Sequence, residues 1–270
     1  MNSAIAFIGG GNMAGALLRG LLRQGAQASD LIVVEPFEAT RKALRAELGI
    51  EVLAEASASL ARAGLVVWAV KPQMFASAAA PCTARVGSAL QLSVMAGIRS
   101  EQIAAATTSE RVVRAMPNTP ALIGQGIAGL YARPAVSEAD RKAAEQLLAP
   151  TGRTLWVERE SDLDTVTALS GSGPAYFFYI VEAMTAAGVE LGLPAAQARE
   201  LALATCGGAA ALAQHSGEDV GVLRQRVTSK GGTTHAALES LSADGVNEAV
   251  QRAVHAAANR ARELGDEFGR

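Results

Sequence analysis

Short apolar runs rich in branched side chains alternate with helix-like patterns up to about residue 157. This alternation is typical of a parallel β-sheet whose strands are joined by crossover helices. The runs are compact and largely apolar, as expected of strands that are covered on both faces. Strands are therefore predicted at residues 4–8, 31–34, 65–70, 90–95, 111–115 and 154–157.

The segment between the first two predicted strands has the pattern of an amphipathic helix. Its apolar residues recur at spacings of three and four and form one stripe that can lie on a sheet. The stripe consists of Ala14, Leu17, Leu18, Leu21 and Leu22. The chain is therefore predicted to begin with a strand, a helix and a second strand.

The second half of the chain lacks strand patterns. From about Ser161 it consists of helical patterns separated by glycine and proline. The breaks lie at residues 171–174, 192–194, 216–217 and 231–232. We therefore predict an α/β domain with a parallel sheet over residues 1–160, followed by an all-α domain over residues 161–270.

Many helical positions of this second domain carry alanine or another small residue, notably in segments 195–213 and 252–261. Such helices bury little apolar surface per turn and need a partner to pack against. A subunit interface would supply one, so the sequence predicts a homodimer or a dimer-based assembly built through this domain.

Length and charge narrow the functional classes. A chain of 270 residues can bury a substantial core, and none of its apolar stretches approaches the roughly 20 residues of a membrane span. The net charge of −2, with both signs interspersed, favours neither nucleic acid nor an anionic membrane as a partner. The N-terminus lacks a basic leader and runs directly into Gly9, so a cytoplasmic location is expected. His215, His235 and His255 lack metal-ligand spacing, and no metal site is predicted.

A glycine-rich turn follows the first predicted strand and opens directly into the amphipathic helix. In this context Gly9 allows a tight turn, Gly11 lets the backbone approach a pyrophosphate, and Ala14 lets helix and strand pack closely. The helix N-terminus, with Asn12 and Met13, then presents free N–H groups and a positive dipole to the phosphates. The pattern predicts a dinucleotide-binding site.

The end of the second predicted strand bears on the choice of dinucleotide. Glu35 lies where an acidic side chain binds the ribose 2′-hydroxyl and repels a 2′-phosphate, which favours NAD. Arg41 and Lys42 lie one or two helical turns further on and would favour a 2′-phosphate, and hence NADP. The cofactor is therefore predicted to be NADP or NAD, and the residues leave both open.

Three further strand ends carry polar or turn-forming residues. Ligands of open α/β sheets bind at the carboxyl ends of the strands. Lys71 is positioned to touch the cofactor ribose or phosphate, although a solvated lysine before a proline-started helix gives the same pattern. The predicted cofactor contacts at these ends are Val70, Lys71, Pro72, Ala96, Gly97 and Asn118, the last three near the nicotinamide.

A second glycine pair lies at residues 227–234, in the helical half of the chain. Backbone N–H groups around Gly231 and Gly232 can converge on an anion, and a helix predicted to start near Thr234 directs its positive end there. Ser229 and Thr234 add hydroxyl groups. An ordinary helix-capping turn would show the same residues, so the pattern alone leaves both interpretations open.

Five motifs in this order carry a family resemblance: GGGNMAGA at 9–16, AVKPQ at 69–73, RAMPNTPA at 114–121, SGSGPAYF at 170–177 and VTSKGGTT at 227–234. Over nearly its whole length the chain resembles Δ1-pyrroline-5-carboxylate reductases. The resemblance implies an N-terminal Rossmann domain, an all-α C-terminal dimerisation domain, and active sites formed between subunits. It also implies NADPH- or NADH-dependent reduction of 1-pyrroline-5-carboxylate to L-proline, the last step of proline biosynthesis.

The resemblance assigns roles to the second glycine pair. It implies that this loop holds the substrate carboxylate and that Thr234, the second threonine, hydrogen-bonds the ring nitrogen and serves as the catalytic residue. The implied substrate-binding residues are Ser229, Gly231, Gly232, Thr233 and Thr234. Lys230 departs from the family, which usually has proline there; its presence makes the loop less rigid and adds a positive charge.

Two other functions share parts of this pattern. A β-hydroxyacid dehydrogenase or related imine reductase has a similar start, but the dehydrogenases carry a lysine where this chain has Phe177, and an apolar residue there favours imine over alcohol chemistry. A non-catalytic dinucleotide sensor would use the same fold. Such a sensor would not need the loop at 227–234, so the sequence favours the enzyme.

Overall fold

The computed structural model describes residues 4–268 and divides into two compact units. The first unit comprises the chain up to Ser172 together with the segment from Ala257 onward, and the second comprises Gly173–Ala256. The last helix therefore begins in the second unit and ends in the first. The domain boundary predicted between residues 160 and 161 does not coincide with the limits of these compact units. It stays a prediction.

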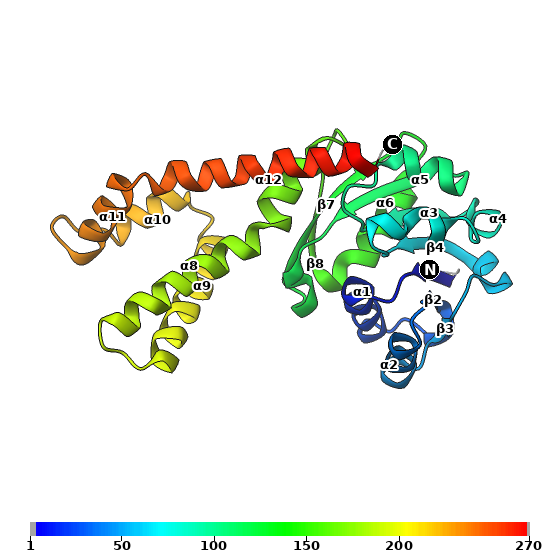
Figure 1. Ribbon diagram of the computed structural model, residues 1–270, viewed down its shortest axis with the longest axis horizontal. Helices are drawn as coiled ribbons and strands as arrows, with labels where there is room; N and C mark the ends of the chain where they lie inside the picture. Colours follow the sequence, from blue (N-terminus) through cyan, green and yellow to red (C-terminus); the bar gives the residue numbers. More distant parts are fainter. Residues whose placement is uncertain (1–3, 269–270) are drawn as a thin grey trace. The chain divides into compact units, whose positions relative to one another are not determined.

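An eight-stranded sheet forms the centre of the first unit (Figure 1), in the order β3-β2-β1-β4-β5-β6-β7-β8. Neighbouring strands from β3 to β6 are parallel, β7 is antiparallel to β6, and β8 is parallel to β7. The strands are β1 Ala4–Ile8, β2 Leu31–Val34, β3 Glu51–Leu53, β4 Ala63–Trp68, β5 Leu90–Ser93, β6 Val112–Met116, β7 Gly126–Ala132 and β8 Gly152–Trp156.

All six predicted strands are confirmed, with shifts of a few residues at their ends. The predicted parallel sheet is confirmed from β3 to β6, whereas β7 and β8 run in the opposite direction. Two strands were not predicted, β3 and β7. β3 has only three residues, and β7 contains glycines and alanines instead of a branched apolar run. Neither segment has enough β-branched content to be distinguished from a loop.

Helices cover both faces of this sheet. The α-helices of the first unit are α1 Asn12–Arg23, α2 Glu38–Leu48, α3 Phe75–Ala79, α4 Thr83–Val86, α5 Ser100–Thr107, α6 Glu138–Leu148 and α7 Asp162–Val166. Its shorter helices are η1 Ala28–Asp30, η2 Ala58–Arg62, η3 Pro72–Met74, η4 Thr119–Ile123, η5 Ala149–Thr151 and the π-helix η6 Thr167–Gly171. The predicted stripe of α1 faces the core, because four of its residues are buried and Leu22 is packed against them.

The core consists of two apolar clusters, one on each face of the sheet. One cluster joins the sheet to α1 and α6, and Phe7 and Leu17 are completely buried in it. The other joins the sheet to α3 and α5 around Trp68, whose ring meets Phe75 edge to face with the ring centres 5.3 Å apart. Covered on both faces, the strands can contribute their ends to a ligand site.

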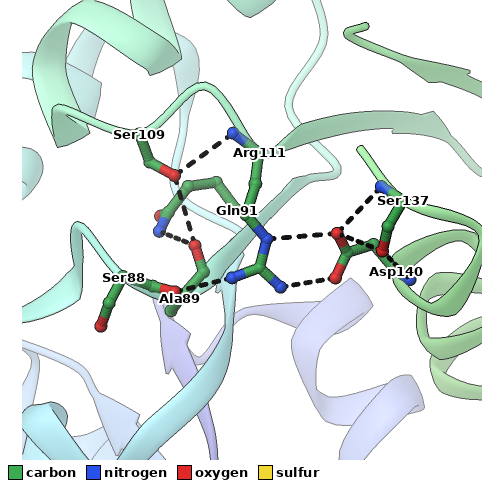
Figure 2. A network of polar contacts seen from close by, with 7 residues as sticks. All are labelled: Ser88, Ala89, Gln91, Ser109, Arg111, Ser137 and Asp140. Atoms are coloured by element: carbon green, nitrogen blue, oxygen red, sulfur yellow. Dashed lines mark hydrogen bonds and ion pairs between the residues drawn. The ribbon is translucent and has the colours of Figure 1, made fainter. Parts of the chain in front are cut away.

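A polar network ties α6 to the amino ends of β5 and β6 (Figure 2). Two guanidinium nitrogens of Arg111 donate to Asp140, at 3.1 and 2.5 Å, and a third donates to the carbonyl of Ser88 at 2.8 Å. Asp140 also accepts hydrogen bonds from the backbone and side chain of Ser137, the residue that caps α6. The hydrogen-bonded Arg111 holds the pKa of Asp140 below its usual value. The network leaves the opposite, carboxyl edge of the sheet for a ligand.

The second unit is built from helices alone, and no strand occurs between Val157 and Phe268. Its elements are α8 Gly173–Glu190, α9 Ala195–Ser216, α10 Val220–Arg226, α11 Thr233–Ala243 and the first part of α12 Val246–Phe268. α8 and α9 lie side by side (Figure 1), and at Gly188 a side chain would lie 2.9 Å from the Cβ of Ala198. No helix within residues 4–268 is long and apolar enough to cross a membrane.

Candidate active site

The glycine turn after β1 has the backbone geometry that its residues predict. Gly9 has a φ of +99°, its N–H donates to the carbonyl of Val34 at 2.8 Å, and a Cβ on Gly9 would lie 2.6 Å from the carbonyl oxygen of Ala69. Only glycine fits there. Gly11 caps the N-terminus of α1, and apart from Gly11 and the residues next to it in the chain no atom lies within 4 Å of the position that a Cβ would occupy. The space in front of this helix N-terminus is therefore open to a phosphate.

The carboxylate of Glu35, at the end of β2, braces the glycine turn from the side. One oxygen accepts the N–H of Gly10 at 2.8 Å and the other accepts the N–H of Phe37 at 2.9 Å, and the residue is only 6% exposed. A carboxylate has about four acceptor positions, so these two bonds leave capacity for a ribose hydroxyl. The ribose contact predicted for Glu35 stays a prediction, and the structure adds its backbone role.

The basic residues beyond β2 are already engaged within the protein. Arg41 donates through Nη1 to the carbonyl oxygens of Glu35 and Pro36, at 3.0 and 2.5 Å. Lys42 forms an ion pair with Glu38 on the same helix at 2.7 Å. A guanidinium therefore lies beside the loop that carries Glu35, whereas the ammonium of Lys42 is paired along α2.

A cavity of about 720 Å³ opens over the carboxyl ends of β1, β2 and β4. Five predicted cofactor residues line it: Gly9, Gly11, Glu35, Val70 and Lys71. Four polar or charged residues that line it were not predicted, Thr40, Glu55, Gln73 and Ser77. Gln73 belongs to the motif at 69–73, and this membership was the one available signal, since the other three lie in segments without a motif.

The remaining predicted cofactor residues have different surroundings. Asn12 is exposed, Ala14 is completely buried, and Met13 packs on the apolar core, so the last two offer a cofactor only their backbone. Pro72 begins η3. None of these four residues lines the 720 Å³ cavity.

The loops after β5 and β6 carry the residues predicted to lie near the nicotinamide. Gly97 has a φ of +75°, so it occupies a conformation that other residues rarely adopt, and Ala96 before it is half-buried. Asn118 accepts the N–H of Ile127 through Oδ1 at 3.0 Å, which fixes the start of β7. The two loops follow neighbouring strands at the same edge of the sheet, outside the 720 Å³ cavity.

A partly buried ion cluster supports these loops and was not predicted. Arg99 makes a two-pronged contact with Asp164, at 2.9 Å for each pair of atoms, and Arg114 pairs with Glu160 at 2.8 Å. The hydrogen bond with Asp164 raises the pKa of Arg99, whereas burial lowers the pKa of Arg114. The cluster connects β6 and the N-terminus of α5 to the segment around α7.

In the second unit, the glycine pair forms a turn that leads into α11. The N–H of Gly232 donates to the carbonyl of Ser229 at 3.0 Å, Gly231 has a φ of +74°, and Gly232 caps α11. The helix begins at Thr233, one residue from the predicted start. Thr233 is exposed and Thr234 is half-buried in its first turn. The predicted substrate-binding residues thus gather around one helix N-terminus, a favourable place for a carboxylate.

The histidines and other possible metal ligands do not gather at this turn. Nε2 of His235 lies 3.3 Å from Oε1 of Glu239, on the same helix α11. Within residues 4–268 no group of three His, Cys, Asp or Glu side chains is placed to hold a metal ion.

A largely parallel sheet, a glycine turn before the first helix and a cavity over the strand ends define a dinucleotide-binding protein of the Rossmann class. Residues 160–264 match the family described as pyrroline-5-carboxylate reductase dimerisation, and residues 4–97 match the family described as NADP oxidoreductase coenzyme F420-dependent.

Full-length relatives narrow this class. A pyrroline-5-carboxylate reductase of Pseudomonas aeruginosa is 44% identical over 267 residues, covering 98% of each chain. A solved pyrroline-5-carboxylate reductase of Coxiella burnetii has a TM-score of 0.92 at 34% identity, covering 98% of this chain and 99% of that one. The Plasmodium falciparum pyrroline carboxylate reductase, solved with NADP bound, has a TM-score of 0.86 at 27% identity and covers 98% of both chains. The chain belongs to the pyrroline-5-carboxylate reductase family.

Proposed function

We infer that the protein reduces 1-pyrroline-5-carboxylate to L-proline with NADPH or NADH, the last step of proline biosynthesis. The observation that carries this inference is similarity to pyrroline-5-carboxylate reductases over 98% of the chain. The open helix N-terminus at Gly11 and the helix N-terminus at Gly232 add two anion-binding positions, one for a pyrophosphate and one for a carboxylate.

The residues around the glycine turn fit a dinucleotide. Gly9 and Gly11 give the backbone access to a pyrophosphate, and the N–H groups of Asn12, Met13 and Ala14 lie in the first turn of α1. Glu35 and Lys71 would contact the ribose and phosphate, and Ala96, Gly97 and Asn118 the nicotinamide end, with Val70 and Pro72 flanking Lys71. When bound, the reduced nicotinamide supplies the hydride.

The loop at 229–234 performs the substrate side of the reaction in this proposal. Backbone N–H groups at Gly231 and Gly232, with the hydroxyls of Ser229 and Thr233, hold the carboxylate, and the Thr234 hydroxyl orients the ring nitrogen and relays a proton to it from water. A protonated imine accepts hydride readily, so the protein chiefly has to fix the ring at about 3 to 3.5 Å from the donor. Family resemblance supports a site completed between two subunits.

The direct test is oxidation of NADH and NADPH in the presence of 1-pyrroline-5-carboxylate and, separately, of other cyclic imines. We expect 1-pyrroline-5-carboxylate to give the highest kcat/KM among them. Tight cofactor binding without oxidation by any imine would favour the dinucleotide sensor. Highest activity on another imine would favour the related imine reductases.

The position of Glu35 leads to a prediction about the use of NADH and NADPH. We expect Glu35→Ala to lower kcat/KM for NADH by about tenfold, because a hydrogen-bonded charge is lost. NADPH should lose less, because repulsion of its 2′-phosphate is removed. Glu38→Ala, an exposed carboxylate paired with Lys42, is the matched control and should leave the ratio of the two efficiencies unchanged. A strong preference of the wild type for NADPH would contradict the role of Glu35.

We propose that the helical unit forms a homodimer or a dimer-based assembly. The match of residues 160–264 to a dimerisation family supports this proposal. It exposes large apolar side chains along α8, α9 and neighbouring segments, namely Phe177, Phe178, Tyr179, Leu191, Leu201, Leu212 and Val220. Light scattering at micromolar concentration should give at least twice the chain mass, and a monomeric mass would contradict the assembly. We also propose a cytoplasmic location, with which the two free cysteines agree.

A further inference from the structure

The last turn of α12 packs behind the turn that follows β5. A Cβ on Gly97 would lie 2.7 Å from Cδ2 of Phe268, so the ring of Phe268 lies directly against the bare backbone of Gly97. Phe268 is partly buried on the apolar cluster that also contains Met95 and Ile98, the residues on either side of this turn. The ring therefore limits how far the turn can move away from the sheet edge.

A single glutamine joins the two segments by hydrogen bonds. Gln102, on α5, accepts the N–H of Arg99 through Oε1 at 2.8 Å and donates through Nε2 to the carbonyl oxygen of Phe268. Arg99 caps the N-terminus of α5, directly after the turn. The end of α12 and the exit of the turn are thus held by the same side chain.

Close approach of α12 at this place depends on a glycine. A side chain at Gly265 would collide with the guanidinium of Arg99, which is itself fixed by its two-pronged contact with Asp164. Contacts of Phe268 with Gly97, and of Gln102 and Gly265 with Arg99, therefore converge on residues 95–99. A turn built from alanine and a glycine with positive φ has no large side chain of its own to hold it, so its position depends on these neighbours.

We propose that the last turn of α12, residues 264–268, is a positioning element for Ala96 and Gly97, and that Phe268 controls the rate of hydride transfer through them. The proposal rests on the proposed function, in which these two residues lie beside the nicotinamide. Phe268 touches neither substrate nor cofactor in this scheme. Its effect follows from geometry, because a displacement of about 1 Å at a reacting centre costs up to about 100-fold in rate.

The test compares Phe268→Ala, Phe268→Leu and the control Glu263→Ala, which removes an exposed ion pair with Arg260 on the same part of α12. At saturating substrates we expect Phe268→Ala to lower kcat about tenfold while the KM for 1-pyrroline-5-carboxylate stays within about twofold. Phe268→Leu, which refills most of the space, should recover kcat to within about threefold of the wild type, and Glu263→Ala should match the wild type. A wild-type kcat in Phe268→Ala, or no recovery by leucine in a folded variant, would overturn the proposal.

A double variant tests whether the contact acts in the working enzyme. Gly97→Ala adds a Cβ that collides with the ring, and Phe268→Ala removes the ring, so the double variant should turn over no more slowly than Gly97→Ala alone. Losses that multiply would contradict the contact.

A readout independent of turnover separates this proposal from the proposed function. The fluorescence of bound NADPH should shift in Phe268→Ala and remain unchanged in Glu263→Ala. Suppose that the fluorescence shifts in Phe268→Ala and not in Glu263→Ala, but that the wild-type enzyme does not reduce 1-pyrroline-5-carboxylate. The positioning role of Phe268 would then stand and the substrate assignment would fall. If the wild-type enzyme is active but bound NADPH has the same emission in Phe268→Ala as in the wild type, only the positioning role is overturned.

Discussion

Thr234→Ala should lower kcat for the reduction of 1-pyrroline-5-carboxylate by about 100-fold, the lower part of the range for a group that transfers a proton in the transition state. The hydroxyl of Thr234 lies in the first turn of α11, beside the N-terminus proposed to hold the carboxylate. Without it the ring nitrogen loses both its orienting partner and its path to a proton. Steady-state assays at saturating cofactor measure the effect.

Two further variants make the Thr234 result specific. Thr234→Ser keeps the hydroxyl and should retain most of the activity. Thr228→Ala removes a nearby hydroxyl that donates to the carbonyl of Arg224 at the end of α10, and it should leave kcat within a few-fold of the wild type. Wild-type turnover in Thr234→Ala would refute the proposed role.

Glu160→Ala should lower the free energy of unfolding by about 3–5 kcal/mol, the usual cost of breaking a buried ion pair from one side. Glu160 accepts the backbone N–H of Ser100 at 2.6 Å, its hydroxyl at 2.5 Å and Nη1 of Arg114 at 2.8 Å. The side chain of Arg114 is only 5% exposed, so its charge would remain buried without a partner. Urea denaturation at neutral pH measures the loss. Glu158→Ala, at an exposed position two residues away, should change stability by less than about 0.5 kcal/mol.

The same residue predicts a pH dependence. Burial alone would raise the pKa of Glu160, but hydrogen bonds from Ser100 and the pairing with Arg114 outweigh it and hold the pKa below its usual value. The unfolded chain therefore binds this proton more readily than the folded chain does. Its contribution to stability is present above about pH 4.3, the ordinary value for glutamate, and is lost as the pH falls through the lower folded value. Glu160→Ala should accordingly show a flatter loss of stability below pH 5, and an unchanged slope would contradict this assignment.

The elements that could be predicted are those whose consecutive residues alone show the apolar pattern of a strand or a helix. β1 and β2 were predicted at their observed limits because apolar residues fill them completely. β7 was missed because Gly129 replaces a branched residue, and the structure shows why: a Cβ there would lie 2.7 Å from a methyl group of Val166 on α7. Packing against a distant helix overrode the local preference of the strand.

The residues of the candidate site also divide into those with a local sequence signal and those without one. Gly9 and Gly231 could be predicted because a positive φ selects glycine itself. The brace between Glu35 and Gly10 spans 25 positions, the contact of Arg99 with Asp164 spans 65, and that of Gln102 with Phe268 spans 166. No local pattern records such partners, so the ion cluster and the role of α12 emerged only from the folded structure.

The return of α12 to the first unit also has a consequence for biosynthesis. A ribosome makes the chain from its N-terminus, so the strands of the sheet and the whole helical unit are translated before the residues of α12 that back the β5 turn. The nascent dinucleotide-binding half therefore cannot gain these contacts until residues 264–268 have been made. Chains that are cut short before these residues should have an intact sheet and an unsupported turn, whose exposed apolar surface would make them substrates for chaperones and proteases.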